Sequence, residues 1–192
     1  PPPPKLPERA NPPPNPPPAP PPAVDTVPAL GQAVPAGNVE QNPAFAGGLL
    51  NWATVNANGS IVTTTDGGKV ALLTRTAGST FTIDDVAPAV AAANPGDTYT
   101  ATSWVRAANA ASVGTTARVR IREAGQQDVA GTLVTLTPGW QKVTATLTAR
   151  GANAIDARVD GNRSVPRQAM NVGFVPVAAS QSPHPPPSPG GF

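Results

Sequence analysis

Three arginines alternate with apolar residues in the segment Arg118–Glu123, and this spacing places Arg118, Arg120 and Arg122 on one face of an extended strand. A guanidinium group makes paired hydrogen bonds to a carboxylate or to neighbouring hydroxyl groups. The row therefore indicates either a binding face for an acidic or hydroxyl-rich ligand, or a solvated face. In the second alternative the arginines form ion pairs with acidic side chains of the chain itself, namely Asp128, Asp156 or Asp160.

Trp104 is the aromatic residue that the pattern places outside the core. The segment Thr98–Ala107 alternates, and its inward side is expected to carry Tyr99, Ala101, Ser103 and Val105. Trp104 and Arg106 then face outward. We expect this strand to form a hairpin with the arginine strand, which would bring Trp104 and Arg106 beside the three arginines. The rival explanation is that an arginine simply covers the indole ring.

Few residues of the chain suit catalysis. It has no Cys, and its one His, His184, lies in a proline-rich tail, which argues against thiol, Ser-His-Asp and zinc chemistry. Asp84 and Asp85 are neighbours, and neighbours in a strand point to opposite faces, so they cannot act as the paired carboxylates of a glycosidase. We expect no enzyme activity, no metal and no cofactor.

Charge and hydropathy argue against two classes of partner, nucleic acids and membranes. The 192 residues include 13 Lys and Arg against 11 Asp and Glu, a net charge of +2. A nucleic-acid-binding surface normally carries a basic patch, which this balance does not indicate. The apolar runs are shorter than the roughly 20 residues that a membrane-spanning helix needs. We expect neither nucleic-acid binding nor membrane insertion.

Alternating patterns and turn residues indicate strands along the rest of the body. These strands are expected near 59–65, 69–76, 80–85, 132–135, 141–149, 155–160 and 169–177. The Ala-rich stretch 86–94 is compatible with one helical turn between two prolines. Many short Thr- and Val-rich strands are typical of an all-β antiparallel sandwich.

Proline marks both ends of the chain. Fourteen of the first 22 residues are Pro, and proline fixes φ and lacks an N–H, which favours an extended polyproline II stalk. We expect a proline-rich stalk over residues 1–37, one domain over 38–179, and a proline-rich tail over 180–192, both arms being disordered. The stalk acts as a spacer or as a ligand for SH3- or WW-type domains.

Four motifs occur in a fixed order over residues 38–178. They are Asn42-Pro43-Ala44-Phe45 with a following Trp52, then Gly68 before an apolar strand, then Pro95-Gly96-Asp97-Thr98-Tyr99 leading to Trp104-Val105, and last Gly139-Trp140-Gln141-Lys142-Val143. In this order they resemble the carbohydrate-binding modules of families 4, 9 and 22. The resemblance implies a jelly-roll β-sandwich of the galactose-binding-like type. Most of its aromatic landmarks, Phe45, Trp52 and Tyr99 among them, are expected in the core.

The calcium site that this resemblance implies is degenerate. Ala46 follows Phe45, and Met170 and Asn171 stand in the last strand, where the family's pattern has acidic residues. Calcium takes six to eight oxygen ligands, with carboxylates supplying charge. We therefore expect no calcium at that site.

The resemblance implies a non-catalytic, extracellular or secreted module that binds a polysaccharide or glycan, acidic glycans included, and is tethered by proline-rich linkers. Trp104 would be the platform, with Arg106, Arg118, Arg120 and Arg122 as hydrogen-bond donors. The alternative is a structural or adhesion domain of a phage particle or cell-surface assembly, located on the virion surface in the first case. It would contact neighbouring protein subunits, and its proline-rich arms would take part. The low aromatic content and the lost calcium ligands favour this alternative.

Overall fold

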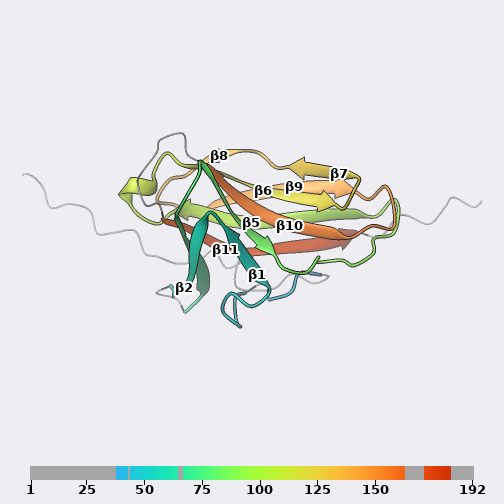
Figure 1. Cartoon of the computed structure of the whole chain (residues 1–192), viewed down its shortest axis with the longest axis horizontal. Coiled ribbons are helices and arrows are strands. Elements are labelled where there is room, and N and C mark those ends of the chain that lie inside the picture. Colours follow the sequence, from blue (N-terminus) through green and yellow to red (C-terminus); the bar gives the residue numbers. More distant parts are fainter. Residues whose placement is uncertain (1–37, 43, 65–66, 163–170, 183–192) are drawn as a thin grey trace, which may run out of the picture.

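The computed structural model describes residues 38–42, 44–64, 67–162 and 171–182, and these residues form two antiparallel sheets (Figure 1). The six-stranded sheet has the order β1 (Trp52–Val55), β4 (Thr80–Asp85), β10 (Ile155–Asn162), β6 (Thr116–Glu123) and β7 (Gln127–Ala130), with β8 (Val134–Thr135) also paired to β6. The five-stranded sheet has the order β2 (Ala57–Thr63), β3 (Lys69–Arg75), β11 (Asn171–Ser182), β5 (Thr98–Ala107) and β9 (Gln141–Thr148).

The core lies between the sheets and is built by the inward residues of each strand. In β5 every second residue is buried, from Tyr99 to Ala107, as the alternation predicts. The largest fully buried side chains come from both sheets and include Phe81, Tyr99, Ile121 and Leu73. Phe45, Trp52 and Tyr99 are buried, which confirms their predicted place in the core. The all-β antiparallel sandwich expected from the sequence is therefore confirmed.

The predicted strands are present, and two short strands were missed. The bounds of β4 and β5 are as expected, whereas β1 and β7 were not expected, since each has only four residues. The stretch 86–94 contains no helical turn. Instead, Val90 forms a β-bridge with Ile155. The short helix η2 (Ala110–Ser112) lies elsewhere, capped by the side chain of Asn109.

The expected hairpin between the Trp104 strand and the arginine strand is wrong. β5 pairs with β9 and β11, whereas β6 pairs with β10, β7 and β8 in the other sheet. The connection 108–115 contains η2 and crosses from one sheet to the other, a separation of about 10 Å. β5 and β6 thus face each other across the core, so their outward residues lie on opposite sides of the sandwich.

The proline-rich arms expected at residues 1–37 and near the C-terminus fall largely outside the described residues. β11 continues to Ser182, past residue 179, where the sequence places the end of the domain. Within the described part of the chain, no helix has the length and apolar character needed to cross a membrane.

Candidate functional site

The outer face of the six-stranded sheet carries a lattice of opposite charges. The register places Arg158 between Asp84 on β4 and Arg120 on β6, and it places Asp160 beside Arg118. Two residues before Arg158 on β10, Asp156 lies opposite Arg122 on β6. Because residues opposite one another in an antiparallel pair share a face, these side chains form rows across the strands.

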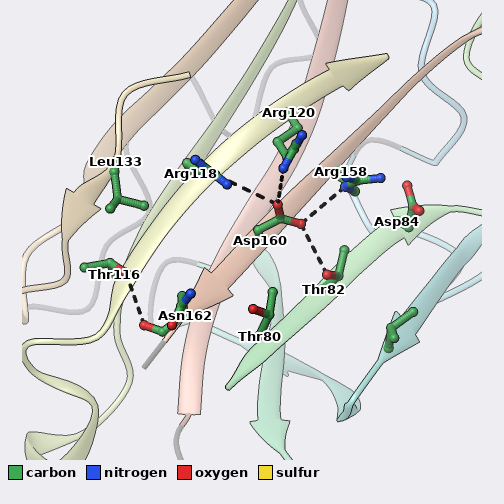
Figure 2. A pocket seen from close by; sticks show the side chains of 11 residues that line it. Thr80, Thr82, Asp84, Thr116, Arg118, Arg120, Leu133, Arg158, Asp160 and Asn162 are labelled. Atoms are coloured by element: carbon green, nitrogen blue, oxygen red, sulfur yellow. Dashed lines mark hydrogen bonds and ion pairs between the residues drawn. The ribbon is translucent and has the colours of Figure 1, made fainter. Parts of the chain in front are cut away.

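A cavity of about 490 Å³ opens on this face (Figure 2). Its polar lining comes from β4, β10 and β6, with the charged residues Asp84, Arg118, Arg120, Arg158 and Asp160 and the smaller polar residues Thr80, Thr82, Thr116 and Asn162. Val55 and Leu133 supply apolar surface, and both are 53% exposed. The volume lies in the range of about 300–1,000 Å³ that is usual for small-molecule sites.

Asp160 is the centre of the hydrogen bonds and ion pairs in the cavity. Its Oδ1 accepts a hydrogen bond from Thr82 Oγ1 at 3.2 Å and lies 3.3 Å from Arg158 Nε. Its Oδ2 lies 3.7 Å from Arg120 Nη1 and 4.0 Å from Arg118 Nε. Figure 2 shows these groups converging on one carboxylate. Asp160 is 8% exposed, so the three guanidinium groups offset the cost of burying its charge.

Asp128 on β7 accepts hydrogen bonds from two of these arginines, Arg120 and Arg158. Arg120 Nε donates to Asp128 Oδ1 at 2.9 Å, and Arg158 Nη2 donates to Asp128 Oδ2 at 3.2 Å. The hydrogen bond to Asp128 is the largest of the causes that raise the pKa of Arg120. The two arginines are therefore fixed from both sides, and the polar lining is preorganised before any ligand arrives.

Asp84 stands apart from this network. Its Oδ1 is buried and has no hydrogen-bond partner among the described residues. Burial and then the charge of Asp156 raise the pKa of Asp84. A buried acceptor without a donor is costly, and burial of this oxygen keeps it out of reach of a ligand in the open cavity.

The predicted site residues separate into three groups. Arg118 and Arg120 line the cavity. Arg122 lies on the same face but outside the lining, where its Nε donates to Asp156 Oδ2 at 2.9 Å. The pairing of these arginines with Asp128, Asp156 and Asp160, the alternative drawn from the sequence, is confirmed.

Trp104 and Arg106 lie on the opposite, five-stranded sheet, so the expected site that combined them with the three arginines is wrong. Trp104 faces outward, as its position predicts, but it is half-buried and packs against Val70 beside Trp140. Arg106 covers the Trp140 ring, with Cζ 4.9 Å from the ring centroid, a cation–π contact. The two surfaces lie back to back, and one ligand cannot bridge them.

Sequence reasoning missed Asp84, Arg158 and Asp160 as cavity residues. The sequence does indicate their direction on β10. Ile155, Ala157 and Val159 alternate inward, so Arg158 and Asp160 face outward. The missing information was which strand lies next to β10.

The residues present do not fit the calcium site that the resemblance implies. The side chain of Ala46 offers no oxygen, and the described ranges contain no group of three or more His, Asp or Glu side chains arranged to hold a metal ion.

The comparisons with known proteins agree with the fold. A family described as a carbohydrate-binding domain matches residues 37–160. Comparison with curated protein sequences finds no match.

Many solved structures resemble the chain, among them the following three. One is an arabinose-bound α-L-arabinofuranosidase, with a TM-score of 0.59, 14% identity, and coverage of 76% of this chain and 26% of that one. A second is tailspike protein 4 of bacteriophage CBA120, with a TM-score of 0.57 and 11% identity, covering 76% of this chain and 22% of that one. A third is a family 61 carbohydrate-binding module in complex with β-1,4-galactotriose, with a TM-score of 0.52 and 13% identity, covering 76% of this chain and 99% of that one. The chain thus spans about a quarter of each of the first two proteins, and at these identities the likeness shows the fold alone.

Proposed function

Because the chain belongs to the family of carbohydrate-binding domains whose pattern covers residues 37–160, we propose that it binds a polysaccharide or glycan in the cavity on the six-stranded sheet, without catalysing a reaction. The observation that carries this proposal is the fixed set of donors and acceptors around Asp160. Sugar hydroxyl groups both donate and accept, so a lining with guanidinium groups beside carboxylates and Thr hydroxyls can satisfy them.

Preorganisation supports a binding role. Arg120 and Arg158 are each held by both Asp128 and Asp160, so little side-chain entropy is lost when they meet a ligand. Val55 and Leu133 offer exposed aliphatic surface to the C–H groups of a sugar. In this proposal the module is extracellular and the proline-rich arms are tethers that hold it away from an enzyme, a wall or a particle.

A structural or adhesion role is the second candidate, and one observation favours it. Among the residues that the structure describes, no aromatic side chain lines the cavity, although aromatic faces commonly stack on sugars. In that case the sandwich contacts neighbouring protein subunits, on a virion or a cell surface.

A glycan array with the full chain, followed by titration calorimetry, tests the proposal. The decisive variant is Arg118→Ala, because Arg118 is the outermost cavity arginine and its ion pair with Asp160 is long at 4.0 Å, so the fold should be spared. We expect Arg118→Ala to weaken binding at least about tenfold, with an unchanged melting temperature. Lys142→Ala on the opposite face is the matched control and should bind as wild type does.

Trp104→Ala tests the site first expected from the sequence. If glycan binding is lost in Trp104→Ala and kept in Arg118→Ala, the site lies on the five-stranded sheet and the cavity proposal is wrong. If the wild-type protein binds no glycan, the structural role becomes the better explanation.

A further inference from the structure

Strand β2 forms one margin of the five-stranded sheet, beside β3 (Figure 1). Among the described residues, no strand pairs with its other edge. The seven residues of β2, ANGSIVT, include no charged residue and no proline. Edge strands are normally short, charged, broken by proline or covered, because an open row of N–H and C=O groups pairs readily with another strand. β2 is neither short nor charged, and no other described strand covers it.

The other margins of the two sheets are protected. β1, β7 and β8 have at most four residues each. The outer edge of β9 is covered by the segment that contains β7, since Gln127 Nε2 donates to Thr148 O at 2.7 Å. Further along this edge, a Cβ built on Gly131 would lie 2.2 Å from Thr144 O, which shows how closely the two backbones approach. Among the described strands, β2 is therefore the one with a long open edge.

The register identifies the backbone groups that β2 presents at this edge. The hairpin of β2 and β3 closes with a hydrogen bond from Thr64 N to Gly68 O at 2.8 Å. Because bonded pairs alternate with unbonded pairs in an antiparallel ladder, the even-numbered residues of β2 bond to β3. The odd-numbered residues direct their N–H and C=O groups to the open edge, and they are Ala57, Gly59, Ile61 and Thr63. One of these groups, Ala57 O, accepts a hydrogen bond from Thr54 Oγ1 at 2.9 Å, and no described strand takes the others.

A partner for this edge must be an extended segment with N–H groups of its own. Proline has no N–H, and prolines divide residues 1–37 and 183–192 so closely that no proline-free run there reaches the seven residues of β2. The proline-rich arms therefore do not suit this edge. A second copy of β2 does suit it, since it has the same length, presents the same row of groups and carries no charge that would repel its copy.

An antiparallel pair of β2 strands around a two-fold axis brings the open groups together. With the axis at Ser60, Gly59 of one copy pairs with Ile61 of the other. In the same register Ala57 pairs with Thr63, so every open residue is used, and the pairs together form about eight backbone hydrogen bonds. The core-facing side chain of Ile61 then lies beside a glycine, which leaves room for it. Because the other margins are protected, this pairing consumes the open edge and stops at two copies.

On these grounds we infer that two copies of this chain pair through β2 and join their five-stranded sheets into one continuous sheet. The two-fold axis is perpendicular to the sheet, so both copies turn the outer face of the six-stranded sheet, with its cavity, to the same side. A polymeric ligand of the kind proposed above would then meet two cavities at once and bind with higher apparent affinity. This last step alone rests on the proposed function.

Sedimentation velocity of the full chain, from micromolar to millimolar concentration, tests the inference. Seven residues a side is far fewer than the roughly 20–30 of a standard interface, so we expect a weak dimer that forms within this range. Ser60 is exposed, and Ser60→Lys places two positive charges opposite each other at the axis. This variant should dimerise about fivefold more weakly, with an unchanged melting temperature. Thr144→Lys, the matched control, adds the same charge on the exposed outer side of β9 and should dimerise as wild type does.

An equal mixture of Ser60→Lys and Ser60→Glu provides the second test, because position 60 faces itself only in the inferred register. The mixture should dimerise more tightly than either variant alone. A wild-type protein that stays monomeric at millimolar concentration would overturn the inference, and so would a dimer whose strength neither charge variant changes. Neither result bears on the proposed function, which the glycan array tests separately.

Discussion

Gly161 on β10 lies directly opposite Phe81 on β4, and the two residues are in close contact. A Cβ built on Gly161 would lie 2.1 Å from Phe81 Cζ and 2.6 Å from both Cε atoms. The ring of Phe81 is fully buried in the core. Because Gly161 separates Asp160 from Asn162, both of which line the cavity, this contact connects the core to the floor of the candidate site.

Gly161→Ala should lower the free energy of unfolding by about 1–3 kcal/mol, since the added methyl group overpacks a rigid aromatic contact. Urea denaturation followed by Trp fluorescence measures the change. Gly139→Ala is the matched control, because its Cβ would meet nothing nearer than 3.8 Å, and it should stay within about 0.5 kcal/mol of wild type. An equal effect of both substitutions would contradict the packing argument.

A second buried contact fixes the loop between β9 and β10. Glu123 is fully buried and accepts hydrogen bonds from the backbone N–H groups of Arg150 and Gly151, at 2.9 Å and 2.7 Å, and from the side chain of Asn153 at 3.1 Å. Burial favours the protonated acid, but these donors and Gln127 outweigh it and lower the pKa of Glu123 to about 2.

Acid should therefore weaken the fold through Glu123. A carboxyl group whose pKa is lower in the folded state stabilises the fold above its unfolded pKa, near 4.5, and this contribution is lost as the pH falls towards 2. Glu123→Gln should cost about 2 kcal/mol at pH 7, since two backbone donors lose a charged acceptor, and should flatten the decline between pH 5 and pH 2. Melting curves over this range measure both effects, and a variant as acid-sensitive as wild type would exclude Glu123 as the cause.

Calcium removal should leave stability unchanged. The reason is that the side chain of Ala46 offers no oxygen and that the described residues hold no metal-binding cluster. Melting curves recorded with added calcium and with a chelator should overlay, because only a ligand that binds the folded state raises its stability. A drop of several degrees with the chelator would show that the folded protein binds calcium and contradict the prediction.

The sequence predicts strands and the direction of their side chains well, because both depend on a local period of two residues. Tyr99 is buried and Trp104 faces outward for this reason. The same period predicts that Arg118 and Arg120 face away from the core. The four-residue strands β1 and β7 offer too few alternations to be recognised.

The candidate site could not be predicted, because it depends on which strands are neighbours. Asp84, Arg158 and Arg120 come from β4, β10 and β6, and they meet only through the register of non-local pairs. Alternation indicates the face on which a residue lies but not the sheet. A hairpin is the usual arrangement for consecutive strands, and the connection through η2 departs from it, which separates Trp104 from Arg118.

The last prediction concerns Glu40, which is 6% exposed and has a buried Oε2 without a hydrogen-bond partner among the described residues. Burial, followed by the charges of Asp85, Asp156 and Asp84, raises the pKa of Glu40 to about 9. A carboxyl group whose pKa is higher in the folded state contributes stability that is complete below its unfolded pKa near 4.5 and is lost as the pH rises towards 9. Glu40→Gln removes this ionisation and keeps the side-chain shape. The variant should match wild type near pH 4.5 and melt at a clearly higher temperature at pH 9. Asp85→Asn should act in the same direction, since burial raises the pKa of Asp85 to about 7, with its gain complete at a lower pH. Thermal melts at pH 4.5, 7 and 9 measure the difference, and a Glu40→Gln protein no more stable than wild type at pH 9 would show that Glu40 ionises freely in the folded state.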